Sequence, residues 1–130
     1  MLMIDPNLGI WLMVAWALAA NGAHKAYIIG RRQAALENAA KSVTTGNIIL
    51  IVGDVTSKES LKSIADRIER EAGYINILIA NSGIGGPHAK VTPETTLEDF
   101  QKQMWEIDFD EYVNTISVNT AAVRYALMVF

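Results

Sequence analysis

The sequence contains no cysteine among its 130 residues. This absence excludes disulfide bonds, thiolate metal sites and thiol catalysis, and it fits a reducing compartment, so we expect a cytoplasmic location. Histidine is scarce as well, because His24 and His88 are single and far apart, and we expect no metal site. The net charge is −3 and no basic block occurs, which argues against nucleic acid as a partner.

The apolar segment at residues 8–20 is too short to cross a bilayer, which takes about 20 residues. A secretory signal peptide is the sharper alternative, because Ala17-Leu18-Ala19 matches the small-residue pattern of a cleavage site. The first seven residues, however, contain Asp5 and neither lysine nor arginine, unlike the basic start of a signal peptide. We therefore expect no association with a membrane.

Short apolar strands alternate with amphipathic helices along the chain. The sequence predicts strands at residues 1–4, 26–29, 48–52 and 75–80 and a loop at 81–96. It predicts helices at 9–21, 33–43 and 57–72, and two last helices capped by Thr96 with Asp99 and by Asp108 with Glu111. The helix at 57–72 follows the capping-box spacing of Thr56 and Glu59, and its apolar face contains Leu61, Ile64, Ala65, Ile68 and Ala72. This alternation indicates right-handed βαβ units on a parallel sheet. We therefore predict an α/β fold of Rossmann type, the N-terminal half of a doubly wound parallel sheet.

Asn81-Ser82-Gly83, directly after the apolar run at 75–80, is the most informative motif. A strand that stops in a small polar turn points to the carboxyl edge of a parallel sheet, where α/β folds bind ligands. Because the strand is apolar almost throughout, we expect both of its faces to be covered. The Asn81 amide can hold the turn, and Gly83 allows a backbone or a flat ligand to come close.

Five motifs, each at a strand end or inside a helix, resemble the short-chain dehydrogenase/reductase family. They are Gly9-Ile10, Gly30-Arg31-Arg32, Asp54-Val55, Asn81-Ser82-Gly83 and Val118-Asn119. The resemblance covers nearly the whole chain but only the first half of the family's pattern. It implies that residues 1–130 are a partial NADP-binding Rossmann domain of an oxidoreductase, which moves hydride between a nicotinamide and a small carbonyl or alcohol substrate.

The resemblance also implies how the phosphates of the cofactor are bound. Gly9 and Ile10 would end a glycine-rich turn that places the pyrophosphate at a helix N-terminus. An acidic residue after the second strand would bind a ribose 2′-hydroxyl, but this chain has Arg31 and Arg32 there, which suit a 2′-phosphate. The implied cofactor is therefore NADP. The structural alternatives are a loop glycine and a solvated arginine at a helix start.

Further positions would contact the adenosine or take part in proton transfer. Asp54 and Val55 would contact the adenine ring, although a plain turn-forming aspartate is equally compatible with the sequence. Asn81 and Gly83 would line the adenosine side of the site. Asn119 would hold a water of the proton relay through its backbone carbonyl, and an asparagine in mid-helix is otherwise unfavourable.

Three positions depart from the family's pattern at the glycine-rich turn. Aligned without gaps, the Thr-Gly opening falls on Ile4 and Asp5, and the last glycine falls on Trp11, whose indole would crowd the cofactor. The first strand, which should lie between the strands at 26–29 and 75–80, is also reduced to residues 1–4, which leaves its neighbours partly unpaired. Each buried unsatisfied backbone group costs about 1–3 kcal/mol.

The family's catalytic tyrosine, with a lysine four residues later and a serine, has no counterpart in these residues. Tyr27, Tyr74, Tyr112 and Tyr125 are all followed by another residue at that spacing. We therefore expect the chain alone to be inactive. The alternative is a non-catalytic remnant or interaction module that associates through its last helix. We interpret Trp105 and the apolar face of that helix as core or as a subunit interface that would make a homo-oligomer. The apolar face contains Val113, Ile116, Val123 and Leu127.

Overall fold

The computed structural model describes residues 2–4, 10–41 and 46–130. Four parallel strands form one sheet in the order β3-β2-β1-β4. The strands are β1 (Leu2–Ile4), β2 (Ala26–Gly30), β3 (Ile48–Val52) and β4 (Leu78–Ala80). The predicted parallel sheet, with the first strand between the second and the fourth, is therefore confirmed.

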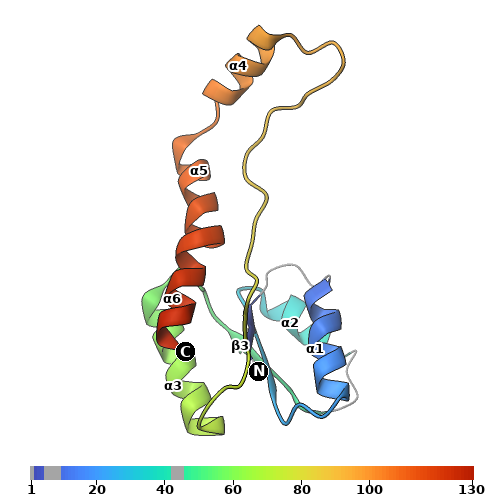
Figure 1. Ribbon diagram of the computed structural model, residues 1–130, viewed down its shortest axis with the longest axis vertical. Helices are drawn as coiled ribbons and strands as arrows, with labels where there is room; N and C mark the ends of the chain where they lie inside the picture. Colours follow the sequence, from blue (N-terminus) through green and yellow to red (C-terminus); the bar gives the residue numbers. More distant parts are fainter. Residues whose placement is uncertain (1, 5–9, 42–45) are drawn as a thin grey trace.

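Helices cover both faces of this sheet (Figure 1). On one side lie α1 (Ile10–Ala20) and α2 (Gln33–Lys41), and on the other lie α3 (Lys58–Ala72) and α6 (Ala122–Val129). Because the sheet is parallel and helices pack on both of its faces, the fold is the predicted incomplete α/β arrangement of Rossmann type.

The core has two parts because successive residues of β2 point to opposite faces. Tyr27 and Ile29 pack toward α3, while Ile28 packs toward the α1 side. The α3 face predicted from its spacing is confirmed, since Leu61, Ile64 and Ile68 are buried. The α3-side part contains Tyr27, Ile29, Ile51, Leu61, Ile64, Ile68 and Ala126, and the α1-side part contains Ala15, Ile28 and Leu36.

The cap predicted at Thr96 is confirmed, whereas the cap predicted at Thr56 was placed one residue too early. At α4 (Leu97–Trp105), Thr96 and Asp99 form the predicted capping box. At α3 the predicted cap, Thr56, is wrong, because the Ser57 hydroxyl accepts the bond from the Ser60 N–H at 3.1 Å. The Thr56 hydroxyl instead donates a hydrogen bond to the Asp54 carboxylate at 2.7 Å.

The fourth strand is shorter than predicted, because β4 covers Leu78–Ala80 and not the whole run at 75–80. Among the described residues, β4 pairs with β1 from Leu2↔Leu78 to Ile4↔Ala80. The expectation that both faces of β4 are covered is confirmed, because Leu78 packs against the α3-side core and Ile79 against the α1-side core. All three residues are nevertheless only half-buried at the edge of the sheet.

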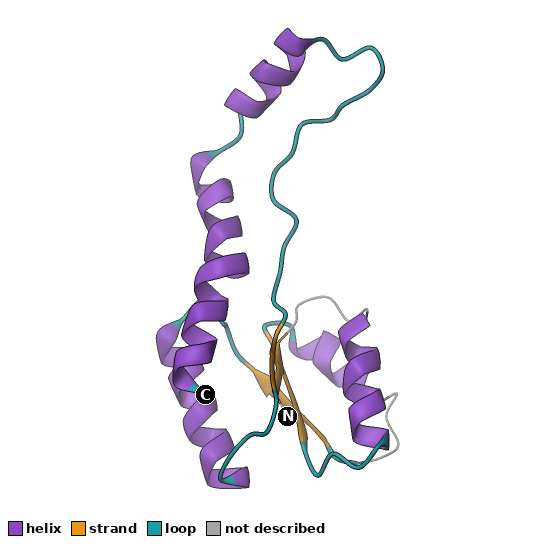
Figure 2. Cartoon of the chain, in the orientation of Figure 1, coloured by secondary structure: helices purple, strands orange, loops and turns teal. Residues whose placement is uncertain are grey.

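The C-terminal part of the chain extends away from the sheet as a helical arm (Figure 2). It contains α4 and α5 (Phe109–Ile116), and a π-helical turn at Ser117–Ala121 connects it to α6, which packs against the sheet. Asp108 caps α5 as predicted, but the single long helix expected after it is interrupted by this turn. No helix in the described part of the chain is both long and apolar enough to span a bilayer.

Candidate functional site

The carboxyl ends of the parallel strands bring three of the predicted site residues to one edge of the sheet. Arg31 directly follows β2, Asp54 comes two residues after β3, and Asn81 directly follows β4. Ile10 is the first residue of α1. Gly9 lies outside the described residues. This edge is where open α/β sheets bind ligands, so the predicted motifs lie where the fold can use them.

Asp54 is held in an ionised state between β3 and α3. One of its carboxylate oxygens accepts hydrogen bonds from the Thr56 hydroxyl at 2.7 Å and the Thr56 backbone N–H at 2.9 Å. These bonds lower the pKa of Asp54, and the positive charge of Arg31 lowers it further against the opposing effect of partial burial. Its own N–H donates to the Ser60 hydroxyl at 2.9 Å, so the backbone of Asp54 is fixed too.

Gly53 brings α3 close to the end of β3, and the sequence interpretation missed it. Its N–H donates to the Gly30 carbonyl at 3.0 Å, which continues the pairing of β2 and β3 beyond the last strand residue. A Cβ at Gly53 would lie 2.5 Å from Cδ1 of Ile64, so the Ile64 side chain would have to shift to admit one. The neighbouring Val55 is half-buried and packs against the core.

Asn119 fastens the loop after β4 to the last helix. Its Oδ1 accepts from the Ile84 N–H at 2.9 Å, and its Nδ2 donates to the Ile84 carbonyl at 3.0 Å. Gly83 and Gly86 lie against this helix as well, since their Cβ atoms would come 3.7 Å from Asn119 Oδ1 and 3.1 Å from the Thr115 methyl group. The asparagine thus holds the turn that begins at Asn81 through both hydrogen-bonding groups of one backbone unit.

Asn119 lies within the π-helical turn at Ser117–Ala121. In this turn the Ala122 N–H bonds to the Ser117 carbonyl five residues earlier. π-helical turns are rare and frequently lie at functional sites. A polar residue in mid-helix was the one sequence signal for this feature, and its partner Ile84 gave none.

Two of the tyrosines have partners in the structure, one in the core and one on the last helix. Tyr27 is 1% exposed in β2. Burial and the nearby Glu71 carboxylate raise its pKa, so the hydroxyl stays protonated and hidden. Lys58 lies 4.3 Å from the centroid of the Tyr125 ring, which is a cation–π contact with the ring face.

Comparisons with known proteins agree with this geometry. A family model described as short chain dehydrogenase matches residues 6–125. The short-chain dehydrogenase/reductase PhomF of Diaporthe leptostromiformis is 44% identical over 124 residues, which are 94% of this chain and 42% of that protein. The short-chain dehydrogenase/reductase VdtF of Byssochlamys spectabilis is 41% identical over 119 residues, which are 88% of this chain and 39% of that protein. The chain thus spans about two fifths of these curated relatives.

Solved structures share the fold over nearly all of the chain. NAD⁺-bound xylitol dehydrogenase superimposes with a TM-score of 0.78 at 24% identity, covering 98% of this chain and 45% of that one. Actinorhodin polyketide ketoreductase with NADPH superimposes with a TM-score of 0.79 at 17% identity, again covering 98% and 45%. At these identities the likeness establishes the architecture.

We predict that Asn119→Ala releases the loop after β4. The substitution removes both bonds to Ile84, each worth about 0.5–1.5 kcal/mol. Hydrogen exchange at the Ile84 amide should therefore become about tenfold faster or more. Asn114→Ala, on the exposed surface of α5, is the matched control. Equal exchange rates at Ile84 in the two variants would contradict the role given to Asn119.

Asp54 should make stability depend on pH. Its pKa is lower in the folded protein than in the unfolded chain, so its stabilising contribution is present above the unfolded pKa. That contribution is lost as pH falls through the folded pKa. We expect Asp54→Asn to reduce the free energy of unfolding at pH 7 and to match the original chain near pH 2, measured by urea titration at both pH values. A pH-independent difference would refute the ionised role of Asp54.

Proposed function

The chain belongs to the short-chain dehydrogenase family, and from this membership we propose that it forms the NADP-binding part of an oxidoreductase. The proposed reaction moves a hydride between the nicotinamide and a small carbonyl or alcohol substrate. One observation carries the proposal. Arg31 follows β2 at the carboxyl edge of the sheet and acts electrostatically on Asp54, which follows the adjacent β3.

The preference for NADP rests on the charges after β2. Arg31 and Arg32 are exposed, and no carboxylate occupies either position. A guanidinium group forms paired, charge-assisted bonds with a phosphate, whereas an NAD-preferring site uses an acidic residue for the ribose hydroxyl. The structural neighbours include an NAD⁺ complex and an NADPH complex. The shared fold is thus compatible with either cofactor, and we assign the choice to these two side chains.

The remaining contacts would follow the same edge of the sheet. The ionised Asp54 offers an acceptor for the amino group of adenine, and Val55 would support the ring beside it. Asn81 and Gly83 would line the adenosine on the β4 side. The N-terminus of α1, beginning at Ile10 after Gly9, would favour the pyrophosphate. The donor set therefore suits a dinucleotide with an additional phosphate.

We propose that these 130 residues bind the cofactor but do not complete the reaction alone. No tyrosine is followed by a lysine at the required spacing, and the hydroxyl of Tyr27 is buried. Within the proposed enzyme, Asn119 would hold the loop after β4 through Ile84, and its backbone carbonyl would hold a water of the proton relay.

A second function, a non-catalytic module that associates through its last helices, has one observation in its favour. Large apolar side chains lie exposed along the arm, so the core alternative for Trp105 is wrong: this residue is 89% exposed, and Phe109 is 78% exposed. Exposed apolar faces of this kind mark interaction sites. The exposed apolar residues of α4 to α6 include Leu97, Phe100, Met104, Trp105, Phe109, Tyr112, Val113, Ile116, Leu127 and Met128.

We predict that NADPH fluorescence rises saturably on titration with the purified chain. Arg31→Ala should weaken NADPH binding about 10- to 100-fold, as expected for a charge-assisted phosphate contact of about 1.5–3 kcal/mol. NADH binding should change much less. Arg70→Ala, at the exposed C-terminal end of α3, removes the same charge away from the carboxyl edge and should leave both affinities unchanged.

The same preparation separates the two proposed functions. If a folded sample gives no NADPH signal, cofactor binding is refuted and the module remains. Sedimentation then tests the module, because Phe109→Asp should reduce self-association. Val91→Asp, at an apolar residue 67% exposed in the loop before α4, should not. A monomeric chain with no NADPH signal would exclude both proposals.

A further inference from the structure

The turn that follows α1 contains an Asn-Gly pair, Asn21-Gly22, and every other asparagine of the chain is followed by a residue with a side chain. Both residues of the pair are exposed. An asparagine side chain is attacked most easily by the next backbone nitrogen when that nitrogen belongs to glycine, because glycine has no Cβ to crowd the ring that forms. The pair therefore has the composition of a site for deamidation.

The backbone nitrogen of Gly22 is available for this attack. On one side of it, the Asn21 N–H donates to the Ala17 carbonyl at 3.0 Å. On the other side, the Ala23 N–H donates to the Leu18 carbonyl at 3.0 Å. The Gly22 N–H between them has no hydrogen-bond partner in the part of the chain that the structure describes. Gly22 has a φ of 92°, and a Cβ built on it would meet no atom within 4 Å, so the space around this residue is open.

The side-chain amide of Asn21 is held by one hydrogen bond at the surface. Its Nδ2 donates to the Ala17 carbonyl at 2.7 Å. A single exposed bond between neutral groups contributes little to stability, because water replaces it readily. The amide can therefore leave Ala17 and bring its Cγ next to the nitrogen of Gly22.

We propose that Asn21 undergoes spontaneous deamidation in the folded protein. The Gly22 nitrogen loses its proton and attacks Cγ of Asn21, and the bond between Cγ and Nδ2 breaks. Nδ2 takes up a proton and leaves as ammonia, and the new bond closes a succinimide ring. Water then adds to one of the two ring carbonyls and opens the ring, which gives aspartate or isoaspartate at position 21. The net reaction consumes one water, releases one ammonia and transfers no electrons.

The aspartate product weakens the end of α1. This helix has no basic residue in its last turn, and its Ala17 carbonyl accepts from the Asn21 amide. A second amide lies beside the first, because Nδ2 of Asn47 donates to the Ala19 carbonyl at 3.0 Å. The same atom donates to the Ala23 carbonyl at 2.7 Å, beyond the turn. A carboxylate at position 21 has no donor for Ala17 and places a negative charge at the negative end of the helix dipole.

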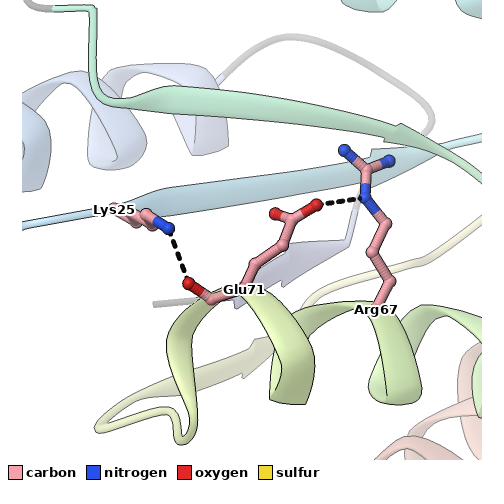
Figure 3. A network of polar contacts seen from close by, with 3 residues as sticks. All are labelled: Lys25, Arg67 and Glu71. Atoms are coloured by element: carbon pink, nitrogen blue, oxygen red, sulfur yellow. Dashed lines mark hydrogen bonds and ion pairs between the residues drawn. The ribbon is translucent and has the colours of Figure 1, made fainter.

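The isoaspartate product also changes the length of a turn whose far end is held in place (Figure 3). The Lys25 ammonium donates to the Glu71 backbone carbonyl at 2.7 Å, and the Glu71 carboxylate accepts from the Arg67 Nε at 2.8 Å. These bonds attach the residue before β2 to the last turns of α3. Isoaspartate adds one methylene to the backbone between α1 and this attachment, so the extra length distorts the turn.

The proposal is tested by peptide mapping, with fragmentation, of the full chain after incubation in the folded state at neutral pH and physiological temperature. The peptide that contains Asn21 should gain about one dalton, the mass difference between an amide and an acid, and should separate into two isomers. Asn76, which is exposed and followed by isoleucine, is the internal control. The gain at Asn21 should be at least about tenfold faster, because the β-branched side chain of Ile77 crowds the ring at Asn76.

Two variants connect the reaction to stability. Asn21→Asp contains the aspartate product from the start and should lower the Tm by at least about 3 °C, because a donor is lost and the new charge opposes the helix dipole. Asn76→Asp makes the same charge change in a loop and should leave the Tm nearly unchanged. Asn21→Gln keeps an amide but closes the larger ring far more slowly. On incubation it should therefore keep its Tm while the original chain loses Tm.

Three outcomes would overturn the proposal. The first is a mass gain at Asn21 only after the chain is unfolded in urea, because the fold would then protect the site. The second is a gain at Asn21 that is no faster than the gain at Asn76. The third is an unchanged Tm for Asn21→Asp, which would refute the effect on α1. None of these readouts involves NADPH, so they are independent of the proposed function.

Discussion

The three-residue strand β1 holds the two halves of the sheet together. It lies between β2 and β4, and these two strands have no other link across the sheet. Every described residue of β1 therefore pairs with one residue of β2 and with one residue of β4. Because a parallel ladder gains one residue pair at a time, the three described residues of β1 pair with the three residues of β4. The carboxyl ends of the strands are aligned.

This alignment explains how a short sheet still organises a site. The loops after β2, β3 and β4 leave the sheet at the same edge, and different hydrogen bonds hold the chain there. Asp54 is held by Thr56 and Ser60, and Gly53 extends the pairing of β2 with β3. The loop after β4 is held from a distance by Asn119. The positions of these loops depend on hydrogen bonds around the strand ends more than on the number of strand residues.

The sequence was sufficient for the order and type of the elements, because apolar periodicity reports which residues are buried. The strand at Ile48–Val52 and the inner face of α3 were predicted as found. The length of β4 could not be predicted, since it depends on a partner strand more than 70 residues away. The sequence also could not predict that Ser57 rather than Thr56 caps α3. Both residues carry a hydroxyl, and only the backbone conformation decides between them. Asn119 was flagged as unusual, but its partner lies 35 positions earlier.

The π-helical turn at Ser117–Ala121 lies between α5 and α6 and changes which way the apolar side chains of these two helices face. An extra residue in a turn shifts the phase of everything that follows by about 100°. Before the turn, apolar residues such as Phe109 and Ile116 point to solvent, while beyond it Ala122 and Ala126 face the sheet. The turn thus changes the direction in which the helix presents its apolar side chains. The part after the turn packs against the sheet of its own domain, and the part before it exposes its apolar side chains to solvent.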